Sequence, residues 1–136
     1  MVRVLYSSDV HGSEQVWLKF LKAIDEYDAD IALMNGDLTG KKIVPIAKMK
    51  DGTWTTPPGI FGKEWKLKSM EEVEKLAERI RYAGMYPFIT SYDEVMEISR
   101  DPKKQDKLFE RMMVESIERW MKLIVEKVNL SKDRVI

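Results

Sequence analysis

Two short segments carry the side chains that could do chemistry, Asp9-Val10-His11-Gly12 and Gly36-Asp37-Leu38-Thr39-Gly40. Asp9, His11 and Asp37 offer carboxylate oxygens and an imidazole nitrogen, the ligands that divalent transition metals select. On an extended backbone, the spacing of Asp9 and His11 would point both side chains to one side. The sequence therefore predicts a site for a divalent metal ion.

The small residues of these segments are expected to shape the site. Gly12 allows the chain to turn into the next element, and Gly36 and Gly40 allow the backbone to approach an ion or its ligand closely. Thr39 stands between Asp37 and Gly40, so it is also expected near the ion or the substrate.

The elements around the two segments predict how they come together. Residues 2–6 and 30–34 are short apolar runs typical of buried strands, and residues 14–27 have the apolar periodicity of an amphipathic helix. Such a βαβ unit has parallel strands that end at the same edge of the sheet, where open α/β sheets bind their ligands.

Each residue also has an ordinary interpretation. A single aspartate after a strand is usually a cap or turn residue, and a single histidine is usually a hydrogen-bonded loop residue. The metal site is favoured by the conjunction, because both motifs occur in this order and each directly follows a predicted buried strand.

The order Ser8-Asp9-Val10-His11-Gly12, then Gly36-Asp37-Leu38-Thr39-Gly40, resembles the first two motifs of the calcineurin-like metallophosphoesterases. The resemblance covers residues 2–40 and implies an α/β fold, the N-terminal part of a four-layer α/β/β/α sandwich. It implies that Asp9 and His11 bind a first metal and that Asp37 bridges two. It further implies hydrolysis of a phosphate mono- or diester at Mn, Zn, Fe or Ni ions roughly 3.5–4 Å apart.

The later motifs of that family have no counterpart here. The chain contains no Gly-Asn pair, and His11 is its only histidine. We therefore expect about half of an active site, with metal affinity roughly micromolar or weaker and little turnover by this chain alone. Residues 134–136 look like the start of a further strand, as in a fragment, a truncated reading frame or one part of a split protein.

Residues 41–130 are expected to form an insertion within a single structural domain, between a core at 1–40 and a third core strand at 131–136. Asp51-Gly52 predicts the turn of a hairpin. Capping signals then predict three helices, which begin after Ser69, Ser91 and Asp101.

The insertion has two interpretations. Its aromatic and proline residues could cover the metal edge or, the favoured alternative, form the insertion's own small core: Trp54, Pro57, Pro58, Phe61 and Trp65. Residues 41–68 contain seven lysines against two acidic residues, so a phosphate-attracting patch and a solvated face are equally open.

Composition excludes several classes of function. The 136 residues contain no cysteine, which excludes disulfide scaffolds, iron–sulfur clusters and cysteine nucleophiles. Basic and acidic residues balance at 23 each, so there is no strong nucleic-acid or membrane signal. We expect a cytoplasmic protein, because neither a membrane span nor a signal peptide is evident. The abundance of Lys, Arg and Glu is thermophile-like.

The leading hypothesis is a metal-dependent phosphoesterase, and the alternative is a non-catalytic interaction module that works through its helical insertion. A receiver-like domain ranks far behind, because the chain lacks the required lysine at a strand end and enough βα repeats. A partner is also expected, either a second copy or the absent C-terminal half, since the last helix would leave an apolar side uncovered.

Overall fold

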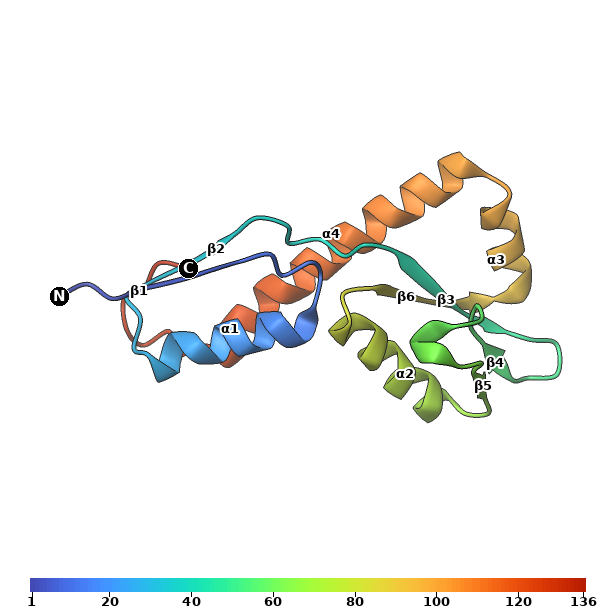
Figure 1. The fold of residues 1–136 in the computed structure, drawn as a ribbon, viewed down its shortest axis with the longest axis horizontal. Coiled ribbons are helices and arrows are strands. Elements are labelled where there is room, and N and C mark those ends of the chain that lie inside the picture. Colours follow the sequence, from blue (N-terminus) through green and yellow to red (C-terminus); the bar gives the residue numbers. More distant parts are fainter.

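The computed structural model describes residues 1–136 and has a mixed α/β fold with two sheets and four α-helices. One end of the elongated molecule contains β1 (Val4–Ser8), α1 (Glu14–Glu26) and β2 (Ile31–Asn35). The long helix α4 (Pro102–Lys127) extends from this end to the second sheet (Figure 1). None of the helices has an apolar stretch long enough to cross a membrane.

The first sheet is the predicted βαβ unit. β1 and β2 pair in parallel, with Val4 opposite Ile31 and Ser8 opposite Asn35. The connecting helix begins after Ser13, whose hydroxyl accepts a hydrogen bond from the Val16 N–H at 3.3 Å. The parallel pairing predicted from the sequence is therefore confirmed, although β1 ends two residues later than expected.

The expected third core strand is present only as one contact. Val135 forms an isolated parallel bridge with Ile31, and the remaining residues of 131–136 are not in a strand. This bridge places the C-terminal segment beside β2, on the side opposite β1.

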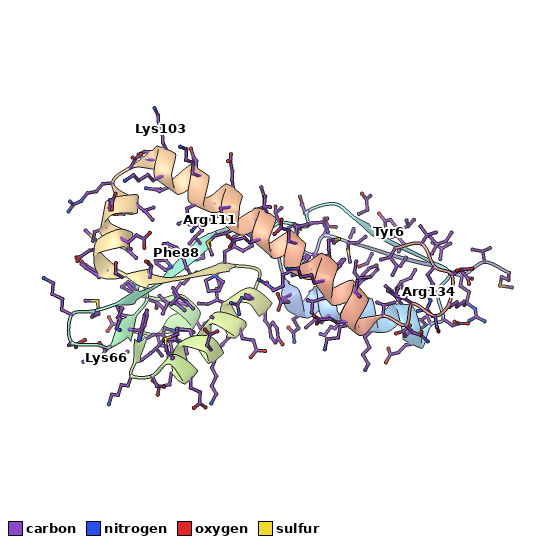
Figure 2. All side chains as sticks on the ribbon, turned by 180° about the vertical axis from the view of Figure 1, so that it is seen from behind. Tyr6, Lys66, Phe88, Lys103, Arg111 and Arg134 are labelled. Carbon is purple, nitrogen blue, oxygen red and sulfur yellow. The ribbon has the colours of Figure 1, made fainter.

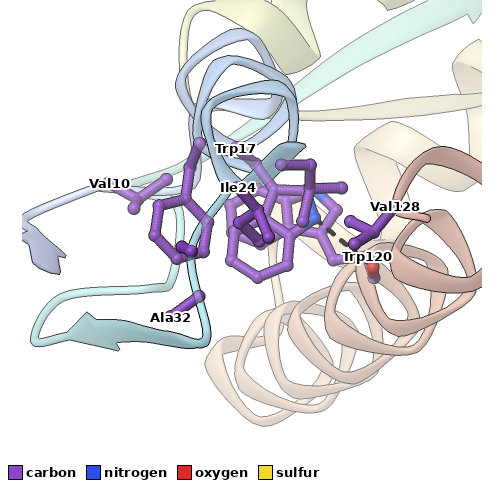
Figure 3. Close-up of a cluster of buried hydrophobic side chains, with 9 residues drawn as sticks. Val10, Trp17, Ile24, Ala32, Trp120 and Val128 are labelled. Carbon is purple, nitrogen blue, oxygen red and sulfur yellow. Dashed lines mark hydrogen bonds between the residues drawn. The ribbon is translucent and has the colours of Figure 1, made fainter. Parts of the chain in front are cut away.

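A hydrophobic cluster lies between α1, the two strands and α4 (Figure 3). Trp17 and Trp120 stack with their ring centroids 5.1 Å apart, and the Trp17 indole N–H donates to the Trp120 carbonyl oxygen. The C-terminal half of α4 therefore packs into the core of the βαβ unit, although it belongs to the predicted insertion. The buried members are Val10, Trp17, Phe20, Leu21, Ile24, Ala29, Ala32, Trp120 and Val128.

The second sheet has the strand order β5-β4-β3-β6. β3 (Ile43–Lys48) and β4 (Trp54–Thr55) are antiparallel, which confirms the predicted hairpin. β5 (Lys66–Leu67) and β6 (Tyr86–Ser91) are strands that the sequence pattern did not predict. β6 contains Pro87, which is tolerated because β6 is an edge strand that pairs only with β3.

Helix α2 (Met70–Tyr82) covers one face of this sheet. Between them lies a second hydrophobic cluster, against which Trp54, Phe61 and Trp65 pack. These aromatic residues therefore belong to the core of the insertion and do not cover residues 9–12 and 36–40, the two candidate metal-binding segments (the metal segments). Its buried members are Val44, Ile46, Ile60, Leu67, Val73, Leu76, Ala77 and Ile80.

The predicted starts of the three later helices are confirmed. Ser69 caps α2, and Ser91 caps the short helix α3 (Tyr92–Ser99), each hydroxyl accepting a backbone N–H three residues later. The Asp101 carboxylate accepts from the N–H groups of the first turn of α4. These local signals worked because each cap lies within one turn of the group that it satisfies.

Three carboxylates at the end of α1 and the turn after it hold the C-terminal segment. Arg134, whose side chain is 5% exposed, pairs with Asp25, and Lys132 contacts Asp28 at 2.7 Å and Asp30 at 3.0 Å. The hydrogen bond from Arg134, supported by the Asn129 N–H, holds the pKa of Asp25 below its ordinary value.

Acid is therefore expected to weaken this attachment. A carboxyl pKa that is lower in the folded state stabilises the fold above the unfolded pKa, about 3.9, and this stabilisation is lost as the pH falls toward the folded pKa. Asp25→Asn should lower the urea unfolding midpoint at pH 7, and the difference from the wild type should narrow at pH 3. Asp133→Asn, at an exposed carboxylate without an ion pair, is the matched control and should change neither midpoint. If the midpoints of the wild type and Asp25→Asn differ by the same amount at pH 7 and pH 3, this attachment is contradicted.

Candidate metal centre

The three predicted ligands lie together beyond the carboxyl ends of β1 and β2. One ligand atom each of Asp9, His11 and Asp37 can be chosen so that all lie within 4.8 Å of one another. His11 Nδ1 lies 3.7 Å from Asp37 Oδ2. The structure thus brings these residues together as expected from the parallel βαβ topology.

The backbone that places them differs from the expectation. β1 ends at Ser8, and Asp9, His11 and Asp37 have φ angles of 58°, 49° and 36°, all in the left-handed region. The prediction that strand alternation aligns Asp9 with His11 was therefore wrong, because neither residue is extended. Left-handed φ costs a non-glycine residue about 1–2 kcal/mol, and such strain concentrates at functional sites.

Backbone hydrogen bonds fasten the two segments to each other. The His11 N–H donates to the Asp37 carbonyl oxygen at 2.6 Å, and the Gly12 N–H donates to the Leu38 carbonyl oxygen at 3.1 Å. Two of the three ligand-bearing residues are therefore linked directly through their main chains. This main-chain hydrogen bond holds the backbones of the two residues side by side.

Close contacts of glycine backbone explain why the segments can cross. A Cβ atom at Gly12 would lie 2.3 Å from the Gly40 Cα, and one at Gly40 would lie 2.8 Å from the Gly84 carbonyl oxygen. Gly40 therefore makes its close approach to protein backbone rather than to the ligand cluster. Gly36 has room for a Cβ, and its φ of 71° is the property that favours glycine there.

Two supporting residues come from a distant part of the sequence. The Gly40 N–H donates to the Tyr86 hydroxyl oxygen at 2.6 Å, and a Cβ at Gly84 would lie 2.4 Å from the His11 carbonyl oxygen. Gly84 follows α2 with a φ of 82°, so its sequence signal is that of an ordinary helix C-terminus. That signal predicts the end of a helix but does not predict the contact with His11.

The ligand cluster is open to solvent. The side chains of His11 and Asp37 are 42% and 70% exposed, and Asp9 accepts a hydrogen bond from the Ser8 hydroxyl at 2.8 Å. Thr39 is exposed and makes no side-chain hydrogen bond with the cluster.

The donor set fits a single divalent ion. Two donors about 2.1 Å from a shared ion lie about 3.0–4.2 Å apart, depending on the angle between them. The separation of 3.7 Å between His11 and Asp37 falls in this range, and the full spread of 4.8 Å needs only a small closing movement of exposed side chains.

A comparison of the chain with protein-family models, curated proteins and solved structures found no match. The features of the chain that indicate a function are therefore its own: the Asp9, His11 and Asp37 donor set, the left-handed backbone that presents these side chains, and the order of the two motifs.

Proposed function

We propose that this chain is a metal-dependent phosphoesterase domain of the calcineurin-like type, in which Asp9, His11 and Asp37 hold a divalent transition metal ion. The single observation that carries the proposal is the convergence of these ligand atoms within 4.8 Å at the carboxyl edge of a parallel βαβ unit. In this proposal, β1, α1 and β2 correspond to the first part of a four-layer α/β/β/α sandwich.

The chain's own residues would have distinct tasks. Asp9, His11 and Asp37 bind the ion, and the hydrogen bond from the His11 N–H to the Asp37 carbonyl keeps two of these ligands in register. When bound, a Mn, Zn, Fe or Ni ion supplies Lewis acidity and positive charge toward a phosphate oxygen. Lys41 and Lys42, shortly after Asp37, add positive charge that attracts an anionic ester.

The same residues set a limit on activity. Three protein ligands suit one ion, and the two-ion centre of the family needs more imidazoles than the one that this chain contains. His11 is the only histidine, so a histidine that binds metal is not free to protonate a leaving group. The proposal therefore assigns slow turnover to the isolated chain.

Hydrolysis of p-nitrophenyl phosphate esters tests this function. With Mn²⁺ we expect slow release of p-nitrophenol above the metal-only background, and Asp37→Asn should remove the enzyme-dependent part. Asp133→Asn replaces an exposed aspartate outside the cluster and should keep the wild-type rate. Equal rates for all three proteins would contradict the proposal, and brisk turnover that Asp37→Asn abolishes would contradict the limit on activity.

An interaction module is the second candidate, favoured by apolar side chains on the outer surface. Val114, Met121 and Val125 of α4 are 53%, 45% and 71% exposed, at spacings that place them along one side of the helix. The βαβ sheet also exposes Val4 and Tyr6. This candidate predicts that Asp37→Asn leaves partner binding unchanged and that no metal copurifies.

A further inference from the structure

A cavity of about 590 Å³ lies between the helices α3 and α4 and the second sheet. This volume is within the range of about 300–1,000 Å³ that is usual for small-molecule sites. Figure 2 shows the side chain of Phe88, a residue of β6, between these helices and the sheet. The apolar side chains of the lining are those of Ile43, Phe88, Val95, Ile98, Leu108 and Phe109.

The cavity occupies the sheet face opposite α2. Val44 and Ile46 are buried in the cluster under α2, so the alternation along β3 directs Ile43 and Pro45 to the other face. α3 buries none of its residues, although Val95 lines the cavity. Apolar surface from both the sheet and the helix therefore borders open space instead of packing together.

Polar contacts hold the roof of the cavity in place. The Gln105 side-chain amide donates to the carbonyl oxygens of Ile98 at 3.2 Å and Ser99 at 2.9 Å, and Lys104 pairs with Glu97. These contacts fasten the end of α3 to the first turn of α4. The two helices that border the space are therefore connected to each other by polar contacts.

Part of the cavity lining follows closely in the chain after Asp37. Lys41 and Lys42 line it, and the four residue-to-residue steps from Asp37 to Lys41 span at most about 14 Å. Tyr86, which accepts the Gly40 N–H, also packs edge-on against Phe109 with ring centroids 5.7 Å apart. One residue thus contacts both the metal segment and the cavity wall.

The charges along the lining favour an anion at the end of the cavity that Lys41 and Lys42 line. Neither Lys41 nor Lys42 forms an ion pair, and Asp106 is the one carboxylate of the lining, which leaves two positive charges against one negative. A ligand that matches both features has an anionic head beside the lysines and an apolar body under the helices.

We propose that the cavity binds the apolar part of an amphiphilic phosphate monoester, whose phosphate lies beside Lys41 and Lys42 and faces the Asp9, His11 and Asp37 cluster. This inference deepens the proposed function and rests on it for the role of the phosphate end. It assigns the substrate class as phosphate esters of aliphatic alcohols, in preference to esters of small polar alcohols.

Calorimetric titration with decyl phosphate and ethyl phosphate, without metal and below the micellar concentration, tests the cavity directly. Decyl phosphate should bind at least about tenfold more tightly, the gain expected from burying about two methylene groups. Equal affinities of the wild-type protein for the two esters would overturn the inference, irrespective of the affinities measured for the variants.

A variant on α3 locates the site. Val95→Glu places a carboxylate in the cavity and should abolish the preference for decyl phosphate, while Tyr92→Glu adds the same charge at an exposed position of the same helix and should keep it. Circular dichroism checks that both proteins fold. A folded Val95→Glu protein with the full preference would overturn the placement.

A separate titration with Mn²⁺ distinguishes this inference from the proposed function. Preferential binding of decyl phosphate by a protein that binds no Mn²⁺ would contradict the metal centre and leave the cavity assignment supported. Binding of Mn²⁺ without any preference between the two esters would overturn the cavity assignment and leave the metal centre supported.

Discussion

Replacement of Gly12 by alanine is expected to lower the free energy of unfolding by about 2–4 kcal/mol. The new Cβ would lie 2.3 Å from the Gly40 Cα and 2.5 Å from the Gly40 nitrogen. Both are backbone atoms, so relief requires the two metal segments to separate, against the hydrogen bond from the Gly12 N–H to Leu38. The φ angle of 72° at Gly12 adds the left-handed penalty of a non-glycine residue.

Urea unfolding of Gly12→Ala and Gly52→Ala separates these two causes. Gly52 has a φ of 84°, and a Cβ there would meet nothing within 4 Å. Gly52→Ala should therefore cost only the left-handed penalty, about 1–2 kcal/mol. Equal losses for the two variants would contradict the close crossing of the metal segments.

Much of the framework of this fold could be predicted from local sequence signals. The apolar periodicity of 14–27 between two short apolar runs predicted the parallel βαβ unit. Asp51-Gly52 predicted the hairpin, and Ser69, Ser91 and Asp101 predicted three helix starts. In each case the residues that carry the signal lie within a few positions of the structure that they specify.

The parts that could not be predicted depend on contacts between distant residues. β6 contains Pro87 and is a strand because it pairs with β3, more than forty positions earlier in the chain. Gly84 and Tyr86 support the metal segments through contacts with His11 and Gly40 that no local pattern encodes.

The candidate site also combines features that local sequence predicts with features that depend on distant contacts. Asp9, His11 and Asp37 were predicted as candidate ligands from their motifs, and their proximity followed from the βαβ topology. The left-handed backbone at Asp9 and His11 did not follow, because it depends on how the segment meets Gly40 and Gly84. The proximity of the three residues was therefore predictable, whereas the conformation that presents them was not.

The largest effect on ligand binding is expected from Asp37→Asn. The amide keeps the size of the side chain but removes the negative charge that attracts a divalent ion, so that Asp9 and His11 remain as the strong ligands. Loss of residues that merely support metal ligands already costs about 10–100-fold in affinity. Loss of Asp37 itself should lower metal affinity by at least about 100-fold.

Calorimetric titration of Mn²⁺ and Zn²⁺ into the wild-type protein, Asp37→Asn and Asp133→Asn tests the metal centre most directly. The wild type and Asp133→Asn should each bind one ion per chain with roughly micromolar or weaker affinity, and Asp37→Asn should show no measurable binding. A wild-type protein that binds neither ion, or three proteins with the same affinity, would contradict the assignment of Asp9, His11 and Asp37 as a metal site.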